Sequence, residues 1–361
     1  MNYLRVFSKI VCFGVALLII TGSAKAQDTP PAPVRDYWPT DGWKESTPEQ
    51  QGMDSQTLAK MKPYIEKELP TIRSVLIVRH GYLAYEQYFQ YFNREYKQNI
   101  IFVNHSITSA LVGIALKEGS LRSLDQKLVD FYPEYVTPEV DPRVRQITLK
   151  HLLTMSSGFD KKDIYWKTTR EKIQQKPVHE PGEIFNYDKS AADFLSSILI
   201  KTTHMSLLDF TKDKLFAPLG ISDVIWEFWP DKSFDIGSFD NEVWHYWGLS
   251  LKPRDMAKFG YLYLHNGIWD GKQVVPSDFV RDSIQKHINT PYWGGSVDYG
   301  YLWWINKVEG HAAYCAAGPG QYIYVIPDQD MVIVITSGRE EPIGENMSII
   351  AKWIVPATLK K

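Results

Sequence analysis

Residues 99–119, NIIFVNHSITSALVGIALKEG, constrain the fold more than any other stretch of the chain. Apolar residues recur there at positions 107, 111, 114 and 115, which is the spacing of one face of a helix. Asn104 or Ser106 would cap this helix, and Gly119 would end it. Gly113 lies in the middle, where glycine lowers helix stability by about 1 kcal/mol relative to alanine. The stretch therefore predicts a helix with one buried face and a close approach of another part of the chain at Gly113.

The same stretch resembles the nucleophile helix of the serine β-lactamase-like superfamily. In the branch that it most resembles, which includes class C β-lactamases, DD-peptidases and nylon-oligomer hydrolases, the segment reads approximately Ser-Val-Thr-Lys-Ser-Ile-Thr-Ser-Ala-Leu-Val-Gly-Ile-Ala. Aligning SITSALVGIA with this pattern places Phe102 in the position of the nucleophilic serine and His105 in the position of the lysine. The residues after the motif agree with the family pattern, whereas the motif itself departs from it.

Other segments carry the resemblance over roughly residues 45–356. They are TLKHLLTMSSG at 148–158, LFAPLGI at 215–221 and LSLKPRDMAKFG at 249–260. In the first of them, Thr148 is expected to cap a short helix that ends at Gly158. His151 within this helix is interpreted as a structural residue, and Arg254 and Asp255 are interpreted as ordering the start of another helix.

Predicted strands lie at both ends of the chain. SVLIVRH and YLAYEQYF flank Gly81 and predict an N-terminal hairpin, and residues 301–307, 322–326 and 331–337 predict C-terminal strands. Helical segments lie between these two sets. The sequence therefore predicts an α+β fold in which an antiparallel sheet is built from both chain ends and a helical subdomain is inserted. The resemblance implies the same β-lactamase/transpeptidase-like architecture.

The expected domain organisation follows from these segments. Residues 27–44 form a proline-rich linker and N-terminal segment, and residues 45–356 form the main domain. Its α/β part covers about 45–100 and 245–356, and its helical part covers about 101–244. Within the α/β part, Asp54 is expected to cap a helix that runs to about residue 69 and is kinked or split by Pro63, and a closing helix is expected at 347–354.

The N-terminus carries the features of a secretory signal peptide. Arg5 and Lys9 precede an apolar run at residues 10–20, and the small residues of Ala24-Lys25-Ala26 follow it. The run is short for a membrane span. Cleavage is expected before Gln27, which makes the protein periplasmic or secreted, without a membrane span.

The net charge argues against nucleic-acid binding, and the cysteine content excludes an internal disulfide in the mature chain. Loss of Arg5, Lys9 and Lys25 with the signal peptide changes the formal net charge from −2 to −5. A mildly acidic chain without a basic run is not expected to bind nucleic acid. Of the two cysteines, Cys12 leaves with the signal peptide, so Cys315 cannot form an internal disulfide and is expected to be a small buried residue.

The resemblance implies acyl transfer through a covalent serine ester, with a lysine one helical turn after the serine acting as a base. Phe102 cannot be acylated because its side chain has no lone pair. His105 has an unperturbed pKa near 6.5 and could act as a base. Ser106 is the alternative nucleophile, but Ser106 and Ser109 lie one and two turns deeper along the helix and are expected to be buried.

Two further family motifs also depart from their patterns. In Phe185-Asn186-Tyr187-Asp188-Lys189 the expected tyrosine, Tyr187, is present, but Lys189 stands in the third motif position. Lys189 either replaces the ammonium lost at position 105 or reflects drift under relaxed constraint. The expected oxyanion and cleft residues are Ala317, Gly318, Gly320 and Gln321, in a turn that is one glycine shorter than the family turn. Displacement of the backbone N–H groups that would stabilise the oxyanion would remove a large catalytic contribution.

Two functional interpretations remain open. The first is an exported β-lactamase-fold protein that has lost serine catalysis and binds a small-molecule or cell-wall-type ligand. The second is an active amide or ester hydrolase that uses water with His105, Tyr187 and Lys189, or uses Ser106. No cofactor and no metal site is expected from the motifs. Tryptophans lie in the segments that would border the cleft: Trp226, Trp229, Trp244, Trp247, Trp293, Trp303 and Trp304.

Overall fold

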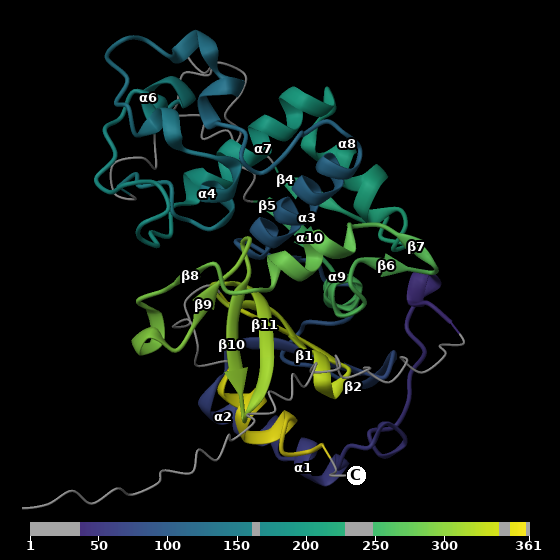
Figure 1. Cartoon of the computed structure of the whole chain (residues 1–361). Helices are drawn as coiled ribbons and strands as arrows, with labels where there is room; N and C mark the ends of the chain where they lie inside the picture. The colour runs from purple at the N-terminus through teal and green to yellow at the C-terminus, as the bar shows by residue number, and fades with distance from the viewer. Residues whose placement is uncertain (1–36, 161–166, 228–247, 339–346, 359–361) are drawn as a thin grey trace, which may run out of the picture. The chain divides into compact units, whose positions relative to one another are not determined.

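The computed structural model describes residues 37–160, 167–227, 248–338 and 347–358 (Figure 1). The chain divides into residues 1–36 and a compact unit that begins at Tyr37. The expected signal peptide and most of the expected linker lie outside the described residues. Among the described residues, the structure contains no helix long and apolar enough to cross a membrane.

One antiparallel sheet organises the compact unit, in the strand order β2-β1-β13-β12-β11-β10-β9-β8 (Figure 1). The N-terminal strand β1 pairs directly with the C-terminal strand β13, so the sheet joins both chain ends. This confirms the predicted α+β fold. The strands are β1 Ile72–Arg79, β2 Tyr82–Tyr88, β8 Ile288–Asn289, β9 Asp298–Tyr299, β10 Trp304–Val308, β11 His311–Gly318, β12 Gln321–Ile326 and β13 Met331–Ser337.

The sheet is buried on both faces. Val75 and Ile77 of β1 belong to one hydrophobic cluster with helices α1 (Ser55–Ala59) and α2 (Met61–Glu68) and the C-terminal π-helical turn Ile350–Ile354. Leu76 and Val78 belong to the other cluster with α9 (Pro253–Leu264). Because successive side chains of a strand point to opposite faces, strands buried on both faces are apolar throughout.

The remaining helices and short strands follow the chain between the two ends of the sheet. The helices are α3 Val103–Lys117, α4 Leu149–Leu153, α6 Thr169–Ile173, α7 Lys189–Thr203, α8 Leu207–Thr211 and α10 Ser277–Ser283. The short strands are β3 Gln98–Asn99, β4 Ile225–Glu227 and β5 Gly248–Leu251 in one small sheet, and β6 Ile268–Trp269 and β7 Lys272–Gln273 in another. Helix α3 is buried at every position from 103 to 115, not only along one face.

Helix α3 begins earlier than the sequence predicted. Asn104 and Ser106 lie inside its first turns, so neither is the cap. Ile101 has a φ of 45°, and its N–H donates to Oδ1 of Asn99 at 3.0 Å, which turns the chain sharply before the helix. The close approach at Gly113 is confirmed: a Cβ there would lie 2.5 Å from Phe279 of α10.

Two other predicted helices also have different limits. The helix capped by Asp54 is confirmed, but it divides at Lys60 and not at Pro63. Pro63 lies in the first turns of α2, where its missing N–H has little cost. Thr148 caps α4 as predicted, although α4 ends at Leu153. His151 helps to cap the start of this helix, because its Nδ1 accepts a hydrogen bond from the N–H of Thr148 at 3.2 Å.

The sheet contains two departures from the predicted strands. The strand expected from residue 301 begins at Trp304, because Leu302 has a φ of 61° and its N–H donates to Leu153 O at 2.9 Å. The long strand β11 was not predicted. Cys315 lies on β11 and is buried as expected, and burial strongly raises the pKa of its thiol.

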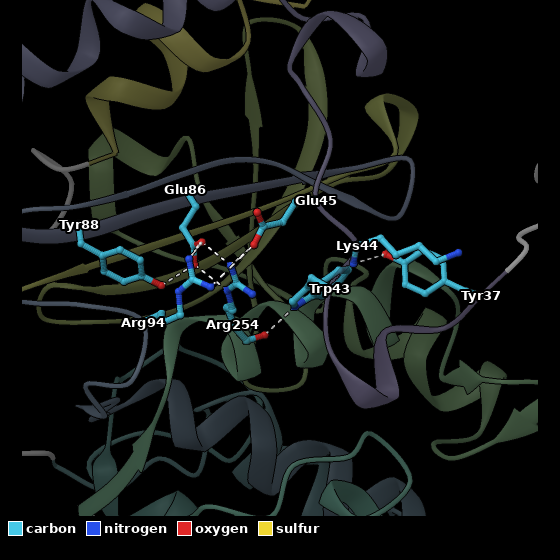
Figure 2. A network of polar contacts seen from close by, with 8 residues as sticks. All are labelled: Tyr37, Trp43, Lys44, Glu45, Glu86, Tyr88, Arg94 and Arg254. Carbon is cyan, nitrogen blue, oxygen red and sulfur yellow. Dashed lines mark hydrogen bonds and ion pairs between the residues drawn. The ribbon is translucent and has the colours of Figure 1, made fainter.

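Residues 37–44 belong to the expected linker, and Glu45 follows it. This segment packs against the rest of the compact unit. Trp43 is buried and its Nε1 donates to Arg254 O at 3.0 Å. Arg254 also donates to both carboxylate oxygens of Glu86 on β2 at 2.7 and 2.5 Å. Figure 2 shows this network, which ties the N-terminal segment and the edge strand β2 to the start of α9.

Candidate active site

The N-terminus of α3 presents Phe102 at the position expected for the nucleophile. The left-handed turn at Ile101 immediately precedes it. A β-branched residue rarely adopts a positive φ, and such backbone strain typically costs about 1–3 kcal/mol and clusters at functional sites. The left-handed turn at Ile101 therefore leads directly into Phe102, whose side chain is an aromatic ring without a hydroxyl.

His105 and Tyr187 meet beside this ring. Nδ1 of His105 lies 3.1 Å from the hydroxyl of Tyr187, and the Phe102 ring centre lies 5.2 Å from that of His105. Burial lowers the pKa of His105 to about 4; nearby Lys189 lowers it further and Asp193 opposes the shift. Burial also raises the pKa of Tyr187. Both side chains are therefore neutral at pH 7, and the phenol is assigned as the donor to Nδ1.

Lys189 lies over Phe102. Its Nζ is 4.3 Å from the centre of the Phe102 ring, a cation–π distance. Burial lowers the pKa of this half-buried lysine, while Asp193 on the same helix raises it. The structure thus places an ammonium group above the ring that occupies the nucleophile position.

A cluster of buried charges lies beside this group, and sequence reasoning missed it. Asp193 forms an ion pair with the fully buried Lys172 of α6 at 3.6 Å. Asp188 caps α7 and is also buried; burial raises its pKa to about 6, although hydrogen bonds from Ser190 and the charge of Lys172 oppose the rise. The sequence signal for this cluster was weak, because Asp188 adjoins Tyr187 but Lys172 and Asp193 are 15 and six positions away.

The third motif reaches Phe102 through Gly318. A Cβ at Gly318 would lie 2.9 Å from the backbone N of Phe102, so the end of β11 touches the start of α3. Gly320 and Gln321 lie against β13 instead: a Cβ at Gly320 would lie 2.4 Å from Gly338 O, and Gln321 Nε2 donates to Ser337 O at 2.7 Å. Of the expected oxyanion residues, Gly318 is therefore the one in contact with Phe102.

Ala317 packs against the hydrophobic cluster that also contains Cys315 and Tyr322. The two serines that follow Phe102 along the helix are buried, as expected: Ser106 is 1% exposed and Ser109 is 0% exposed. Ser106 Oγ donates to Leu302 O at 2.6 Å, so its hydroxyl proton is engaged by the backbone. Neither serine faces solvent.

Aromatic side chains surround Tyr187. Trp304 stacks on its ring at 5.7 Å, and Phe185, Tyr292 and Tyr299 contact this pair. Trp303, expected at the cleft, is instead fully buried against Phe259 and Tyr263. Trp303 precedes β10, so only Trp304, the first residue of that strand, reaches the site. Trp229, Trp244 and Trp247 lie outside the described residues.

Comparison with known proteins agrees with this arrangement. A family model described as Beta-lactamase matches residues 74–351, which include Phe102, His105, Tyr187, Lys189 and Gly318. The chain belongs to the β-lactamase family.

Individual relatives are distant from this β-lactamase family member. An uncharacterised protein of Alkalihalophilus pseudofirmus is 25% identical over 189 residues, 46% of this chain. The match spans only 50% of that relative's length.

Solved structures share the fold. A putative 6-aminohexanoate-dimer hydrolase from Bacillus anthracis has a TM-score of 0.65 at 21% identity, covering 82% of this chain and 80% of that one. A putative β-lactamase from Bacteroides dorei has a TM-score of 0.69 at 15% identity, covering 85% and 100%. An octameric penicillin-binding protein homologue from Pyrococcus abyssi has a TM-score of 0.64 at 20% identity, covering 83% and 76%. At these identities, the similarity shows a common fold.

Proposed function

We propose that this protein is an exported member of the β-lactamase family that has lost serine acyl transfer and binds a ligand at the site around Phe102. One observation carries the proposal. The position expected for the nucleophile holds a phenylalanine ring, and the ammonium of Lys189 lies 4.3 Å above that ring. An aromatic ring has no atom that can form an acyl ester, and the cation covers the same position.

The neighbouring hydroxyls do not offer a substitute nucleophile. Ser106 is buried and donates to a backbone carbonyl at 2.6 Å. Tyr187 has a pKa raised by burial, so at neutral pH it is not a phenolate. These features support the binding role over a covalent mechanism.

The aromatic surroundings support ligand binding. Tyr187 and Trp304 stack with an interplanar angle of 16°, and Tyr292, which is 37% exposed, lies against Trp304. Aromatic rings next to a few polar groups are typical of small-molecule sites. A sugar-containing fragment of the cell wall is a suitable ligand, because the apolar faces of sugar rings stack on such side chains.

Two measurements test this proposal. Incubation with a fluorophosphonate, with an active serine hydrolase as positive control, should leave the intact mass unchanged. A thermal-shift titration with soluble muropeptides should raise the melting temperature of the wild type and not that of the matched variant Trp304→Ala. A covalent adduct would contradict the loss of acyl transfer, and equal shifts for both chains would contradict ligand binding at this site.

The second candidate is a hydrolase that activates water with His105, Tyr187 and Lys189. The contact of 3.1 Å between His105 and Tyr187 favours it. Its weakness is the pKa of about 4 for His105, because an efficient general base has a pKa near the working pH. Steady hydrolysis of p-nitrophenyl acetate that is lost in His105→Ala would support this candidate against the first.

A further inference from the structure

The carboxylate of Asp193 adjoins charged side chains of two helices. Asp193 lies on α7 four residues after Lys189, and residues at this spacing are neighbours on a helix surface. Its Oδ2 is 3.6 Å from Nζ of Lys172 on α6. Lys172 is 1% exposed and Asp193 is 8% exposed, so these two charges meet away from water. Asp193 therefore has one lysine as a neighbour on its own helix and a second lysine on α6.

Lys172 contacts the start of α7 at two successive residues. Besides its ion pair with Asp193, its Nζ lies 5.7 Å from the centre of the Phe194 ring. The helix that carries Lys172 begins at a capping box, in which the N–H of Thr168 donates to Glu171 at 2.7 Å and the N–H of Glu171 donates to Thr168 at 3.2 Å. The ammonium group of Lys172 is thus held against α7 from a helix with a defined start.

The energetics of buried ion pairs do not account for this pair as a stabilising contact. Two charges lose their hydration on burial, and their attraction often fails to offset that cost. Apolar residues of similar volume in the same place are often equally stabilising or more so. The buried pair therefore points to a role for the charge of Asp193 itself.

The charge of Asp193 acts on three titratable groups around Phe102. Burial lowers the pKa of His105 and the pKa of Lys189, and the charge of Asp193 opposes the shift at both residues. Burial raises the pKa of Asp188 to about 6, where the charge of Lys172 opposes the rise and that of Asp193 adds to it. These groups belong to α3, to the first residue of α7 and to its cap, so one carboxylate influences the charge of the whole site.

We propose that Asp193, held by Lys172, is a positioning residue that keeps the ammonium of Lys189 protonated over the Phe102 ring. The nearby carboxylate offsets part of the hydration that the half-buried ammonium loses. Lys172 holds this carboxylate against α7 and neutralises part of its charge. The inference deepens the binding role proposed for the Phe102 site and rests on that proposal for its purpose.

The test is an NMR titration of the Lys189 side chain in the full chain with ¹³C-labelled lysine, in which Lys189→Arg identifies the resonance. Lys172→Met removes the cation that competes for Asp193, so the carboxylate should act more strongly on Lys189 and raise its pKa. The double variant Lys172→Met with Asp193→Asn removes both charges of the pair. The pKa of Lys189 should then fall below that of the wild type, because the carboxylate no longer opposes the effect of burial.

The opposite signs separate this role from a structural one. If the pair only joined α6 to α7, its loss would admit water to Lys189, and the pKa of Lys189 would rise in both variants. Lys201→Met is the matched control, because Lys201 is on the same helix and its Nζ lies 3.2 Å from Glu134. It is twelve residues after Lys189, or about 18 Å along the helix, and its loss should leave the Lys189 titration unchanged.

A rise in Lys172→Met together with a fall in the double variant would support the proposal. A rise in both variants, or an unchanged pKa of Lys189 in the double variant, would overturn it. Circular dichroism establishes that each variant is folded, and if Lys172→Met is not, the sign of the shift in the double variant decides. No ligand takes part in this test, so a failure of muropeptide binding bears on the proposed function and not on the role of Asp193.

Discussion

The Nζ of Lys189 lies 4.3 Å from the centre of the Phe102 ring, and the two residues come from different helix starts. Phe102 precedes α3, and Lys189 is the first residue of α7. Each residue departs from a family motif, yet the departures fit each other as a cation and an aromatic face. The contact therefore brings the two motif departures together in the site, with the cation over the face of the ring.

The first prediction concerns the titration of His105. NMR of the imidazole should give a midpoint near pH 4, because burial lowers this pKa from about 6.5. The unfolded chain binds a proton between these values and the folded chain does not, so stability should fall as the pH drops through this window. His105→Gln should remove up to about 3 kcal/mol of this pH-dependent loss. A midpoint near 6.5 would show that the imidazole is solvated.

The second prediction concerns the contact between β11 and α3. Gly318→Ala should destabilise the fold by about 1–3 kcal/mol, because the new methyl group would lie 2.9 Å from the backbone N of Phe102. Gly338→Ala is the matched control, since its nearest neighbour would be 3.7 Å away. Chemical denaturation measures both. Equal effects of the two substitutions would mean that β11 does not press on the start of α3.

The third prediction concerns the network of Figure 2. Burial alone would raise the pKa of Glu86, but hydrogen bonds from Arg254 and Tyr88 outweigh it and lower the pKa. A lowered carboxylate pKa stabilises the fold above the unfolded value of about 4.3, and this contribution is lost as the pH falls through the folded value.

Glu86→Gln should therefore lower stability at pH 7 by roughly 1.5–3 kcal/mol, the usual range for hydrogen bonds to charged groups. Its melting temperature should also fall less steeply than that of the wild type between pH 5 and pH 3. Parallel pH profiles for the two chains would contradict the assignment.

The fourth prediction concerns export. The apolar run at residues 10–20 and the small residues at 24–26 predict a mature chain that starts at Gln27. Intact mass of material recovered from outside the cytoplasm measures the cleavage site directly. Retention of residues 1–26 on that material would contradict processing at this site.

The elements that the sequence predicted well have strong periodic patterns. The β1–β2 hairpin, β12 and β13 are apolar runs bounded by turn residues, and α3 has a helical stripe. Strand β11, HAAYCAAG, was missed because four small alanines give it no β-branched signal. The start of α3 was misplaced because the turn at Ile101 depends on a hydrogen bond to the side chain of Asn99, the last residue of β3.

The candidate site was predictable only in part. The resemblance predicted that Phe102, His105 and Tyr187 lie close together, and they do so in the structure. The ion pair between Lys172 and Asp193 joins residues 21 positions apart on two helices, and no local pattern encodes it. Gln321 was expected near the oxyanion site, but its amide bonds to β13, because the two-residue turn ends β11 and starts β12 directly.

The last prediction is a partial restoration of acylation. Phe102→Ser with His105→Lys places a serine and a lysine one helical turn apart, and Tyr187 already lies 3.1 Å from the side chain at position 105. Phe102 is only partly buried, so its removal should cost less than the roughly 3–5 kcal/mol of a fully buried aromatic. Circular dichroism should therefore show a folded variant.

The folded double variant should take one fluorophosphonate at residue 102 and turn over poorly. Lys189 adds a second cation beside the new lysine, and the short turn after Gly318 places Gly320 and Gln321 against β13. Peptide mapping locates the label, and Phe102→Ala with His105→Lys is the control that retains the lysine without a nucleophile. Equal labelling of both chains would place the reactive group elsewhere. Efficient ester hydrolysis by the serine variant would show that Lys189 and the short turn do not impair the site.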